Sequence, residues 1–307
     1  MTSLPRLSVI VPVFNGGKTL NATISSLLMV DYPTDRIQIL IVDNHSSDQT
    51  AQLIQGYPRV EYAFEGHRTS YAARNKGGLR AVGDVLAFTD GDCTVATGWA
   101  RAGVTTLLEN PDVHLVGGPV GVGPTDTPMQ QFLQRAGNNN PRSSMRKGYF
   151  PTANLFVRRE VFEHLGGFDE RMASGGDLDF CWRARYAGYR LGFSDECAVF
   201  HQHRDTQKSM YRQAFKYGYG SRTLRAKHSK LAEPSDEECA RYFRDTAMVN
   251  VAKRASADLQ EAWQHRNSED PAQHTDPLLR FIRTSAFLAG AVKYEYDTRV
   301  TKARGRK

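Results

Sequence analysis

Continuous apolar runs alternate with segments of helical spacing through the first 90 residues of the chain. The apolar runs are rich in β-branched side chains, and they cover residues 7–13, 37–43, 60–65 and 84–90. Between them, apolar positions recur every three to four residues over 18–30, 47–57 and 70–82. Strands that are buried on both faces give such runs, and their alternation with helices is typical of parallel sheets. The pattern predicts an α/β fold with a mostly parallel, doubly wound central sheet flanked by helices.

The second half of the chain is less regular and then becomes helical. A strand, a helix and a glycine-containing turn are predicted over residues 152–170, and a glycine-led helix over 175–189. A short strand over 197–204 ends in two histidines, and helical spacing dominates the remainder. We therefore expect a first domain of residues 1–225 that contains the sheet. A helical C-terminal extension is expected over residues 226–307.

Polar side chains follow three of the predicted strands at their carboxyl ends. The segments concerned are "VFN" (13–15), "VDNHSSD" (42–48) and "TDGDC" (89–93). In an open parallel sheet, ligands bind outside the carboxyl ends of the strands. The polar side chains of these segments are therefore expected at the edge of the sheet where a ligand binds.

Two carboxylates stand side by side in the segment "FTDGDC". Asp90 and Asp92 point to the same side if the chain is extended there, and Gly91 allows the backbone to turn closely against a ligand. Like charges this close persist when something positive lies between them, and Mg²⁺ and Mn²⁺ prefer oxygen ligands and phosphates. The pair predicts a site for a metal-bound diphosphate. The alternative is an ordinary turn, because Asp and Gly are common turn residues.

Other polar residues near the predicted strand ends allow two interpretations each. Asp43 is suited to accept hydrogen bonds from a ribose or a base, or to cap the following turn. Arg74 presents a planar fork for phosphate oxygens, or lies on a solvated helix face. His201 and His203 offer nitrogen ligands to a metal, or are surface residues.

Composition restricts the class of protein without choosing the function. The 307 residues are 40% hydrophobic and 24% charged, an ordinary globular balance, and the net charge of +7 favours polyanionic partners. No stretch reaches the roughly 18 consecutive apolar residues of a membrane-spanning helix, and the N-terminus lacks a signal-peptide pattern. The four cysteines lack metal-ligand spacing. These features predict a cytoplasmic protein with reduced thiols.

Seven segments in a fixed order resemble the inverting family 2 glycosyltransferases of GT-A fold. They span roughly residues 6–222, and the last 80 or so residues lie outside the resemblance. The segments are "SVIVPVFNGGKTL", "ILIVDNHSSDQT", "AARNKGG", "GDVLAFTDGDC", "TANLFVRREVFEHLGGFDE", "GGDLDFCWRARYAGY" and "VFHQHR". The resemblance implies a GT-A, Rossmann-like sheet and transfer of a sugar from a nucleotide-diphosphate sugar.

The resemblance assigns roles on the donor side of the site. Pro12 and Asp43 are expected to line the pocket for the base and ribose, with Arg74 beside them. Asn154 is expected to contact a donor or acceptor sugar, with a turn residue as the alternative. Uridine diphosphate is the commonest nucleotide of the family and is therefore the favoured donor group.

The resemblance also implies a metal site at the D-G-D segment. The second aspartate of the family motif, here Asp92, is expected to bind Mn²⁺ or Mg²⁺, and His201 is expected to complete the site. Asp90 is expected to contact the ribose or metal-bound water. The metal would act as a Lewis acid on the leaving diphosphate.

The expected catalytic base is Asp177, in the segment "GGDLDF". The family usually has Glu-Asp here, whereas this chain has Gly176 before the aspartate, so an acidic neighbour that often helps bind the acceptor is missing. Residues 177 and 179 would point about 200° apart within one helix. We therefore expect Asp177 in a loop or cap that faces the cleft. Asp179 is expected in the first helical turn, with a structural or acceptor-binding role.

The C-terminal part suggests a partner besides the nucleotide sugar. Aromatic and basic residues interleave over 212–222, and an apolar stripe covers 278–292. These features predict either a peripheral contact with the inner face of the membrane or ordinary helix packing. The acceptor is expected to be a glycan, a lipid-linked molecule or a small molecule, with no nucleic acid as partner.

Four other classes of protein are weighed against the glycosyltransferase. A Rossmann dehydrogenase requires G-x-G-x-x-G, which "PVFNGGKTLNA" lacks, and "NGGKT" lacks the first glycine of a P-loop. A non-enzymatic, basic nucleic-acid-binding protein remains as an alternative, and its binding would depend on salt but not on Mn²⁺. A relative that binds sugar nucleotides without catalysis is the fourth possibility.

Overall fold

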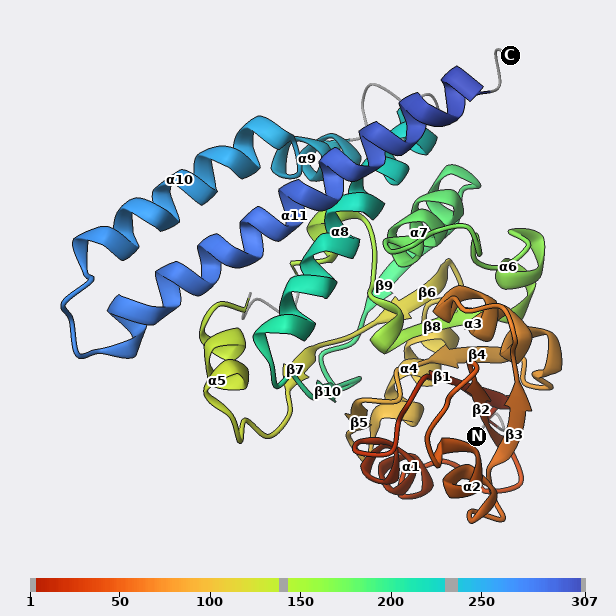
Figure 1. The fold of residues 1–307 in the computed structure, drawn as a ribbon. Helices are drawn as coiled ribbons and strands as arrows, with labels where there is room; N and C mark the ends of the chain where they lie inside the picture. Colours follow the sequence, from red (N-terminus) through yellow and green to blue (C-terminus); the bar gives the residue numbers. More distant parts are fainter. Residues whose placement is uncertain (1–3, 138–142, 230–236, 305–307) are drawn as a thin grey trace. The chain divides into compact units, whose positions relative to one another are not determined.

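The computed structural model describes residues 4–137, 143–229 and 237–304 (Figure 1). The chain forms two compact units, each assembled from segments that are distant in sequence. The first unit comprises 1–124, 139–171 and 176–202, and the second comprises 125–138, 172–175 and 203–307. The boundary expected after residue 225 lies inside the second unit, within helix α8 (Gln207–His228).

A seven-stranded sheet forms the centre of the first unit, which confirms the predicted fold class. Its strand order is β3-β2-β1-β4-β8-β6-β9, and the first four of these strands are parallel to one another. Strand β8 runs antiparallel to both of its neighbours, and β9 is parallel to β6. The strands are β1 (Leu7–Val13), β2 (Ile37–Asp43), β3 (Glu61–Phe64), β4 (Val85–Phe88), β6 (Val113–Gly117), β8 (Leu155–Arg158) and β9 (Arg190–Phe193).

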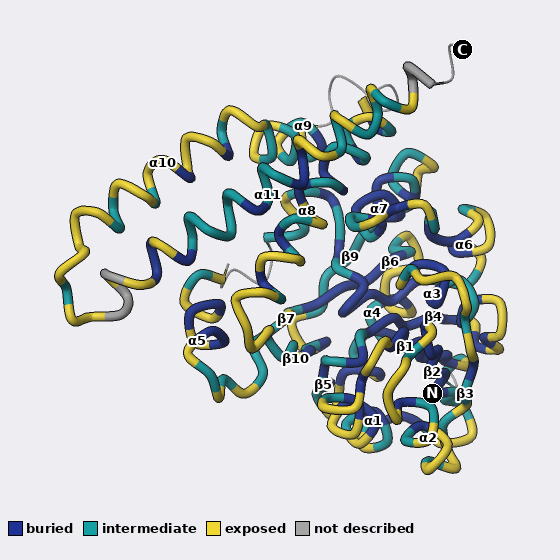
Figure 2. Tube along the Cα trace, in the orientation of Figure 1, coloured by how far each residue is buried: buried dark blue, intermediate teal, exposed yellow. Residues whose placement is uncertain are grey.

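The apolar runs of the sequence form the interior of this sheet. Every residue of β1 and β4 is buried (Figure 2), as expected for strands that helices cover on both faces. Helix α3 packs so closely on the sheet that a Cβ at Gly77 would collide with the side chain of Ile10. The helices of this unit are α1 (Leu20–Leu28), α2 (Thr50–Gln55), α3 (Ser70–Arg80), α4 (Trp99–Glu109), α6 (Arg159–His164) and α7 (Gly176–Tyr186).

A second, three-stranded sheet lies in the same unit and has the order β5-β10-β7. It consists of β5 (Cys93–Val95), β7 (Val120–Val122) and β10 (Val199–His201). Strand β10 is antiparallel to β5, and His201 is the register partner of Cys93. Because β5 directly follows the D-G-D segment, this pairing brings His201 next to the two aspartates although more than 100 residues separate them in sequence.

Helices are the regular secondary structure of the second unit within its described residues, and turns and loops connect them. This unit contains α5 (Pro128–Arg135), α8, α9 (Glu237–Asp245), α10 (Met248–Gln264) and α11 (Pro271–Arg304). Helix α11 packs against both α8 and α10, and α10 and α11 together form a long hairpin (Figure 1). Gly218 of α8 and Gly290 of α11 let the two backbones approach closely, because a Cβ at either position would collide with the other helix. Among the described residues, no helix is both long and apolar enough to cross a membrane.

Candidate active site

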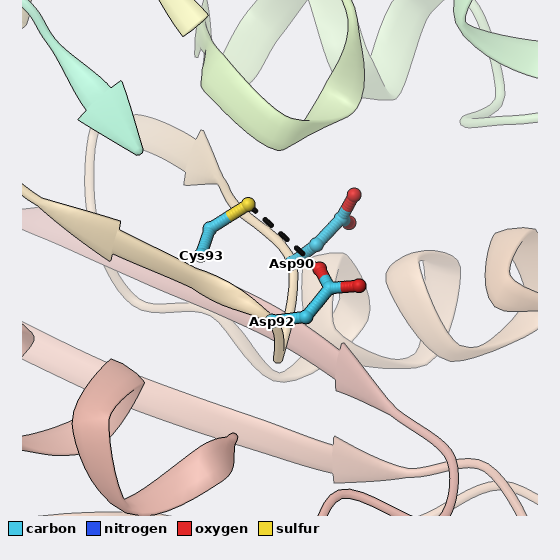
Figure 3. Close-up of side chains that lie close together, drawn as sticks. All are labelled: Asp90, Asp92 and Cys93. Carbon is cyan, nitrogen blue, oxygen red and sulfur yellow. Dashed lines mark hydrogen bonds between the residues drawn. The ribbon is translucent and has the colours of Figure 1, made fainter. Parts of the chain in front are cut away.

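The D-G-D segment forms a tight turn between β4 and β5. Gly91 lies against β1, where a Cβ would come within 3.1 Å of the side chain of Val13, and its carbonyl accepts a hydrogen bond of 2.7 Å from Thr19 Oγ1. Figure 3 shows the carboxylates of Asp90 and Asp92 directed to the same side of this turn. Ligand atoms of Asp90, Asp92 and Cys93 lie within 4.8 Å of one another. The turn that the sequence left open is therefore present, and it is what brings the two carboxylates close; the metal site stays a prediction.

His201 lies beside Asp92, a member of this group, on the paired strand β10. Its Nε2 lies 3.4 Å from Asp92 Oδ2, and the backbone N–H of Gln202 donates a hydrogen bond of 2.8 Å to the carbonyl of Asp92. Two carboxylates and an imidazole are suitable ligands for a divalent cation. Cys93 is fully buried, and burial raises the pKa of its thiol well above the usual value. Burial thus favours the protonated thiol, a form that binds metals poorly.

Arg74 forms an ion pair with one of the two carboxylates. This arginine of α3 is only 4% exposed, and its Nη2 donates a hydrogen bond to Asp90 Oδ1. Its guanidinium also lies 5.6 Å from the ring centroid of Tyr71. Its Nε is buried without a partner among the described residues. The guanidinium is therefore not on a solvated helix face; it lies buried at the edge of the acidic group.

Asp177 lies in the first turn of α7, where the sequence indicated a loop or cap. The helix begins at Gly176, directly after Gly175, whose φ of +78° is accessible mainly to glycine. The Oδ1 atom of Asp177 accepts a hydrogen bond of 3.0 Å from the N–H of Leu178.

Burial raises the pKa of Asp177 to about 6. The Leu178 N–H and the charge of Arg74 oppose this rise, and the charge of Asp90 adds to it. Asp177 is therefore electrostatically coupled to the Arg74–Asp90 pair. A carboxylate whose pKa lies near neutrality is a suitable proton acceptor.

Tyr71 is a residue of this site that sequence reasoning missed. Its hydroxyl oxygen accepts a hydrogen bond of 2.8 Å from the N–H of Gly176. A Cβ at position 176 would come within 2.6 Å of the Tyr71 ring, so the ring occupies the space that a larger residue would need. The available signal was its position three residues before Arg74, on the same face of α3.

Asp179 points to a different environment from Asp177. It is fully buried, and Arg183 Nε lies 2.9 Å from its Oδ2. Arg183 also donates to the carbonyls of Leu165 and Gly167, so the pair ties α7 to the end of α6. Of the two roles left open by the sequence, this geometry favours the structural one.

Pro12 and Asp43 lie on the neighbouring strands β1 and β2, at their carboxyl ends. Asp43 is 3% exposed; its Oδ1 accepts from the N–H of Ser46 at 2.9 Å, and its Oδ2 accepts from the Tyr62 hydroxyl at 3.4 Å. The contact with Ser46 is the local turn that the sequence left open.

Exposed aromatic side chains follow the same strand ends. Phe14 is 58% exposed after β1, and Phe64 is 51% exposed at the end of β3. The ring centroid of His45 lies 5.8 Å from that of Phe64. Aromatic faces of this kind can stack against a nucleobase, although the sequence analysis assigned them no role.

Asn154 is fully buried rather than open to a cleft. Its Oδ1 accepts from Trp99 Nε1 at 2.9 Å, and its Nδ2 donates to the carbonyls of Cys197 at 2.7 Å and Pro119 at 3.1 Å. These contacts use its hydrogen-bonding capacity inside the protein. The geometry favours a structural role.

Comparison with known proteins identifies the class of enzyme. The sequence model of the Glycosyl transferase family 2 matches residues 8–166, more than half of the chain. The chain is also 34% identical over 228 residues to the glycosyltransferase AglE of Haloferax volcanii, covering 72% of this chain and 74% of that protein. The chain therefore belongs to glycosyltransferase family 2 and is a glycosyltransferase, which confirms the resemblance and decides against the non-enzymatic alternative.

More distant relatives agree with this assignment. The chain is 28% identical over 242 residues to the pre-mycofactocin glycosyltransferase of Mycobacterium tuberculosis, covering 74% of this chain and 49% of that protein. Among solved structures, the mannosyltransferase PcManGT of Pyrobaculum calidifontis, in complex with GDP-Man and Mn²⁺, has a TM-score of 0.69 at 19% identity. This structural match covers 96% of this chain and 88% of the PcManGT chain. TarS 1–349 of S. aureus with UDP has a TM-score of 0.53 at 17% identity, covering 95% and 92%. These likenesses show the GT-A fold.

Proposed function

We propose that the chain is a metal-dependent, inverting glycosyltransferase that moves a sugar from a nucleotide-diphosphate sugar to an acceptor hydroxyl. One observation carries this proposal. Asp90, Asp92 and His201 lie close together, and Asp177, whose pKa is raised, belongs to the same compact unit. Arg74 links the two, because it pairs with Asp90 and its charge acts on Asp177. An acidic metal-binding group and a carboxylate close to neutrality are the two components that a direct displacement at an anomeric carbon requires.

Asp92 and His201 are the residues that would hold a Mn²⁺ or Mg²⁺ ion. When bound there, such a cation offsets the negative charge that develops on the leaving diphosphate. Asp90, held by Arg74, contacts the ribose side of the donor. Pro12 and Asp43 line the base and ribose, with Phe14 and Phe64 as stacking surfaces. We retain UDP as the favoured nucleotide, and the two solved relatives, with GDP-Man and with UDP, make GDP the first competitor to test.

Asp177 acts as the general base. Its carboxylate takes the proton of the acceptor hydroxyl while that oxygen forms a bond to the anomeric carbon and the bond from this carbon to the diphosphate oxygen breaks. Attack from the face opposite the leaving group inverts the configuration. A base of this kind contributes about 10²–10⁴-fold to the rate. Tyr71 holds the N-terminus of α7 through Gly176 and thereby fixes where the base stands.

The roles of the two domains expected from the sequence are part of the same proposal. We assign sugar transfer to residues 1–225 and contact with the acceptor, or with the inner face of the membrane, to the C-terminal extension of residues 226–307. Asp179 and Asn154 remain candidates for sugar contact only if the substrate displaces the contacts that now bury them.

A donor panel tests the proposal directly. Release of nucleoside diphosphate from UDP-, GDP- and dTDP-sugars is measured with Mn²⁺, with Mg²⁺ and with EDTA. Asp177→Asn should abolish transfer and leave nucleotide binding intact, whereas Asp92→Ala should weaken Mn²⁺-dependent donor binding. Asp35→Asn, an exposed aspartate outside the site, serves as the control. Transfer that survives in Asp177→Asn, or donor affinity that Asp92→Ala leaves unchanged with Mn²⁺, refutes the respective role.

A further inference from the structure

Three cations form a stripe on one face of helix α8. Lys208, Arg212 and Lys216 are spaced four residues apart and are all exposed. Because residues four apart are neighbours on a helix, the three side chains follow one another over about 12 Å of the helix surface. We call these three residues the α8 basic stripe. Tyr211, which is 43% exposed, lies between Lys208 and Arg212 along the helix.

Carboxylates do not neutralise the α8 basic stripe within the described residues. Among these residues, no carboxylate forms an ion pair with Lys208, Arg212 or Lys216. Other cations of the same unit are paired. The pairs are Arg135–Asp276, Arg222–Glu295, Arg280–Asp258 and Lys293–Asp297. The stripe is therefore a place where this unit leaves adjacent positive charges uncompensated.

Local helix energetics do not account for this arrangement. Like charges at i and i+4 destabilise a helix, and cations near the N-terminus are opposed by the helix dipole. Helix α8 begins at Gln207 and has no acidic residue in its first turn, so Lys208 lies at the unfavourable end. An anionic partner that covers the face would remove both penalties.

The charge of the two units points to the same kind of partner. The second unit contains 22 of the 40 Lys and Arg residues but only 14 of the 33 Asp and Glu residues, a net charge of +8. The first unit, which holds the candidate active site, is therefore close to neutral. The basic character of the chain belongs to the helical unit, not to the nucleotide-binding sheet.

We propose that the α8 basic stripe binds the surface of an anionic phospholipid bilayer. A row of cations with an aromatic side chain between them matches such a surface, since anionic headgroups are spread over a plane and amphipathic rings favour the headgroup level. The inference rests on the membrane contact proposed above and places it on α8, before residues 226–307, at the side chains of Lys208, Arg212 and Lys216.

Vesicle sedimentation with the full chain tests this inference without any sugar donor. The protein should bind vesicles of phosphatidylcholine mixed with phosphatidylglycerol, not vesicles of phosphatidylcholine alone, and added salt should weaken binding. The variant Lys208→Gln, Arg212→Gln, Lys216→Gln should partition about 100-fold more weakly, since each cation contributes about fivefold. Failure of sugar transfer would leave this result untouched, so the two proposals can fail separately.

Two matched variants give the experiment its controls. Arg59→Gln, Lys76→Gln, Arg80→Gln removes the same charge from the first unit and should bind as the unmodified chain does. Lys208→Arg, Arg212→Lys, Lys216→Arg keeps the charge and should retain binding.

Three results would overturn the inference. The first is an absence of binding to anionic vesicles at low salt, and the second is an equal loss in the Arg59, Lys76, Arg80 variant. The third is release by soluble inorganic diphosphate at constant ionic strength, because this would indicate a discrete phosphate site instead of a bilayer contact.

Discussion

Replacing the proposed base, Asp177→Asn, should stabilise the fold at neutral pH. The pKa of Asp177 rises from 3.8 to about 6 because its half-buried side chain is largely withdrawn from water. A carboxyl group with a raised pKa holds its proton more tightly in the folded state than in the unfolded state. Its ionisation therefore favours unfolding, and the stability it removes grows as the pH rises from about 4 to about 6.

The structure gives the size of this effect. A shift of about two pKa units corresponds to about 3 kcal/mol, and partial exposure of the side chain to water lowers this to about 2 kcal/mol. Asparagine has no charge to bury, and its Oδ1 can still accept the hydrogen bond from the N–H of Leu178. For a unit of this size, about 2 kcal/mol raises the melting temperature by about 4–8 °C.

Thermal unfolding of the two proteins between pH 4.5 and pH 7.5 is the assay, with EDTA and without donor. The gain of Asp177→Asn over the unmodified chain should be largest at pH 7.5 and should shrink as the pH falls. Asp35→Asn should change the melting temperature little and without a trend in pH. If Asp177→Asn is no more stable at pH 7.5 and the difference does not vary with pH, Asp177 is not a buried, costly charge.

Three further changes test other parts of the structure. Tyr71→Phe leaves the buried N–H of Gly176 unpaired, so it should lower the stability of the fold by about 1–3 kcal/mol. It should also lower kcat while donor affinity stays unchanged, and an unchanged kcat contradicts a positioning role. The transfer rate should fall about tenfold per pH unit below about pH 6 as Asp177 is protonated, and a rate that is constant down to pH 5 excludes it as the base. Gly290→Ala places a methyl group against the Phe215 carbonyl and should lower the melting temperature of the helical unit, whereas Ala289→Ser should not.

The first 90 residues of the fold could be predicted from the sequence because apolar runs alternate there with helical spacing, and because β1 and β2 are seven residues long, rich in β-branched side chains and mostly buried. Strands β1 to β4 and helices α1 to α3 lie where the apolar runs and helical spacing placed them. The short strands β5 and β7 have three residues each and gave no such signal. Their position depends on pairing with β10, a long-range contact that no local pattern encodes.

The candidate site could be predicted as far as strand ends determine it. Asp90 and Asp92 follow a buried strand, so their convergence was expected from the sequence alone. Tyr71 could not be found in this way, because its role depends on contact with Gly176, 105 residues further along. Asn154 and Asp179 show the reverse case: their polar side chains indicated binding, but each lies in the interior and pairs with other parts of the protein.

The arginine of α3 gives the two aspartates different chemistry. Asp90 is paired with the buried Arg74, so most of its charge is compensated before any ligand arrives. Asp92 has its Oδ2 3.4 Å from the imidazole of His201, which can bind a cation as a neutral group. A cation that enters between these carboxylates therefore gains most from Asp92, while Asp90 remains oriented by its arginine. The same guanidinium opposes the rise in the pKa of Asp177. One buried cation on α3 thus links the residues proposed for metal binding and for proton transfer.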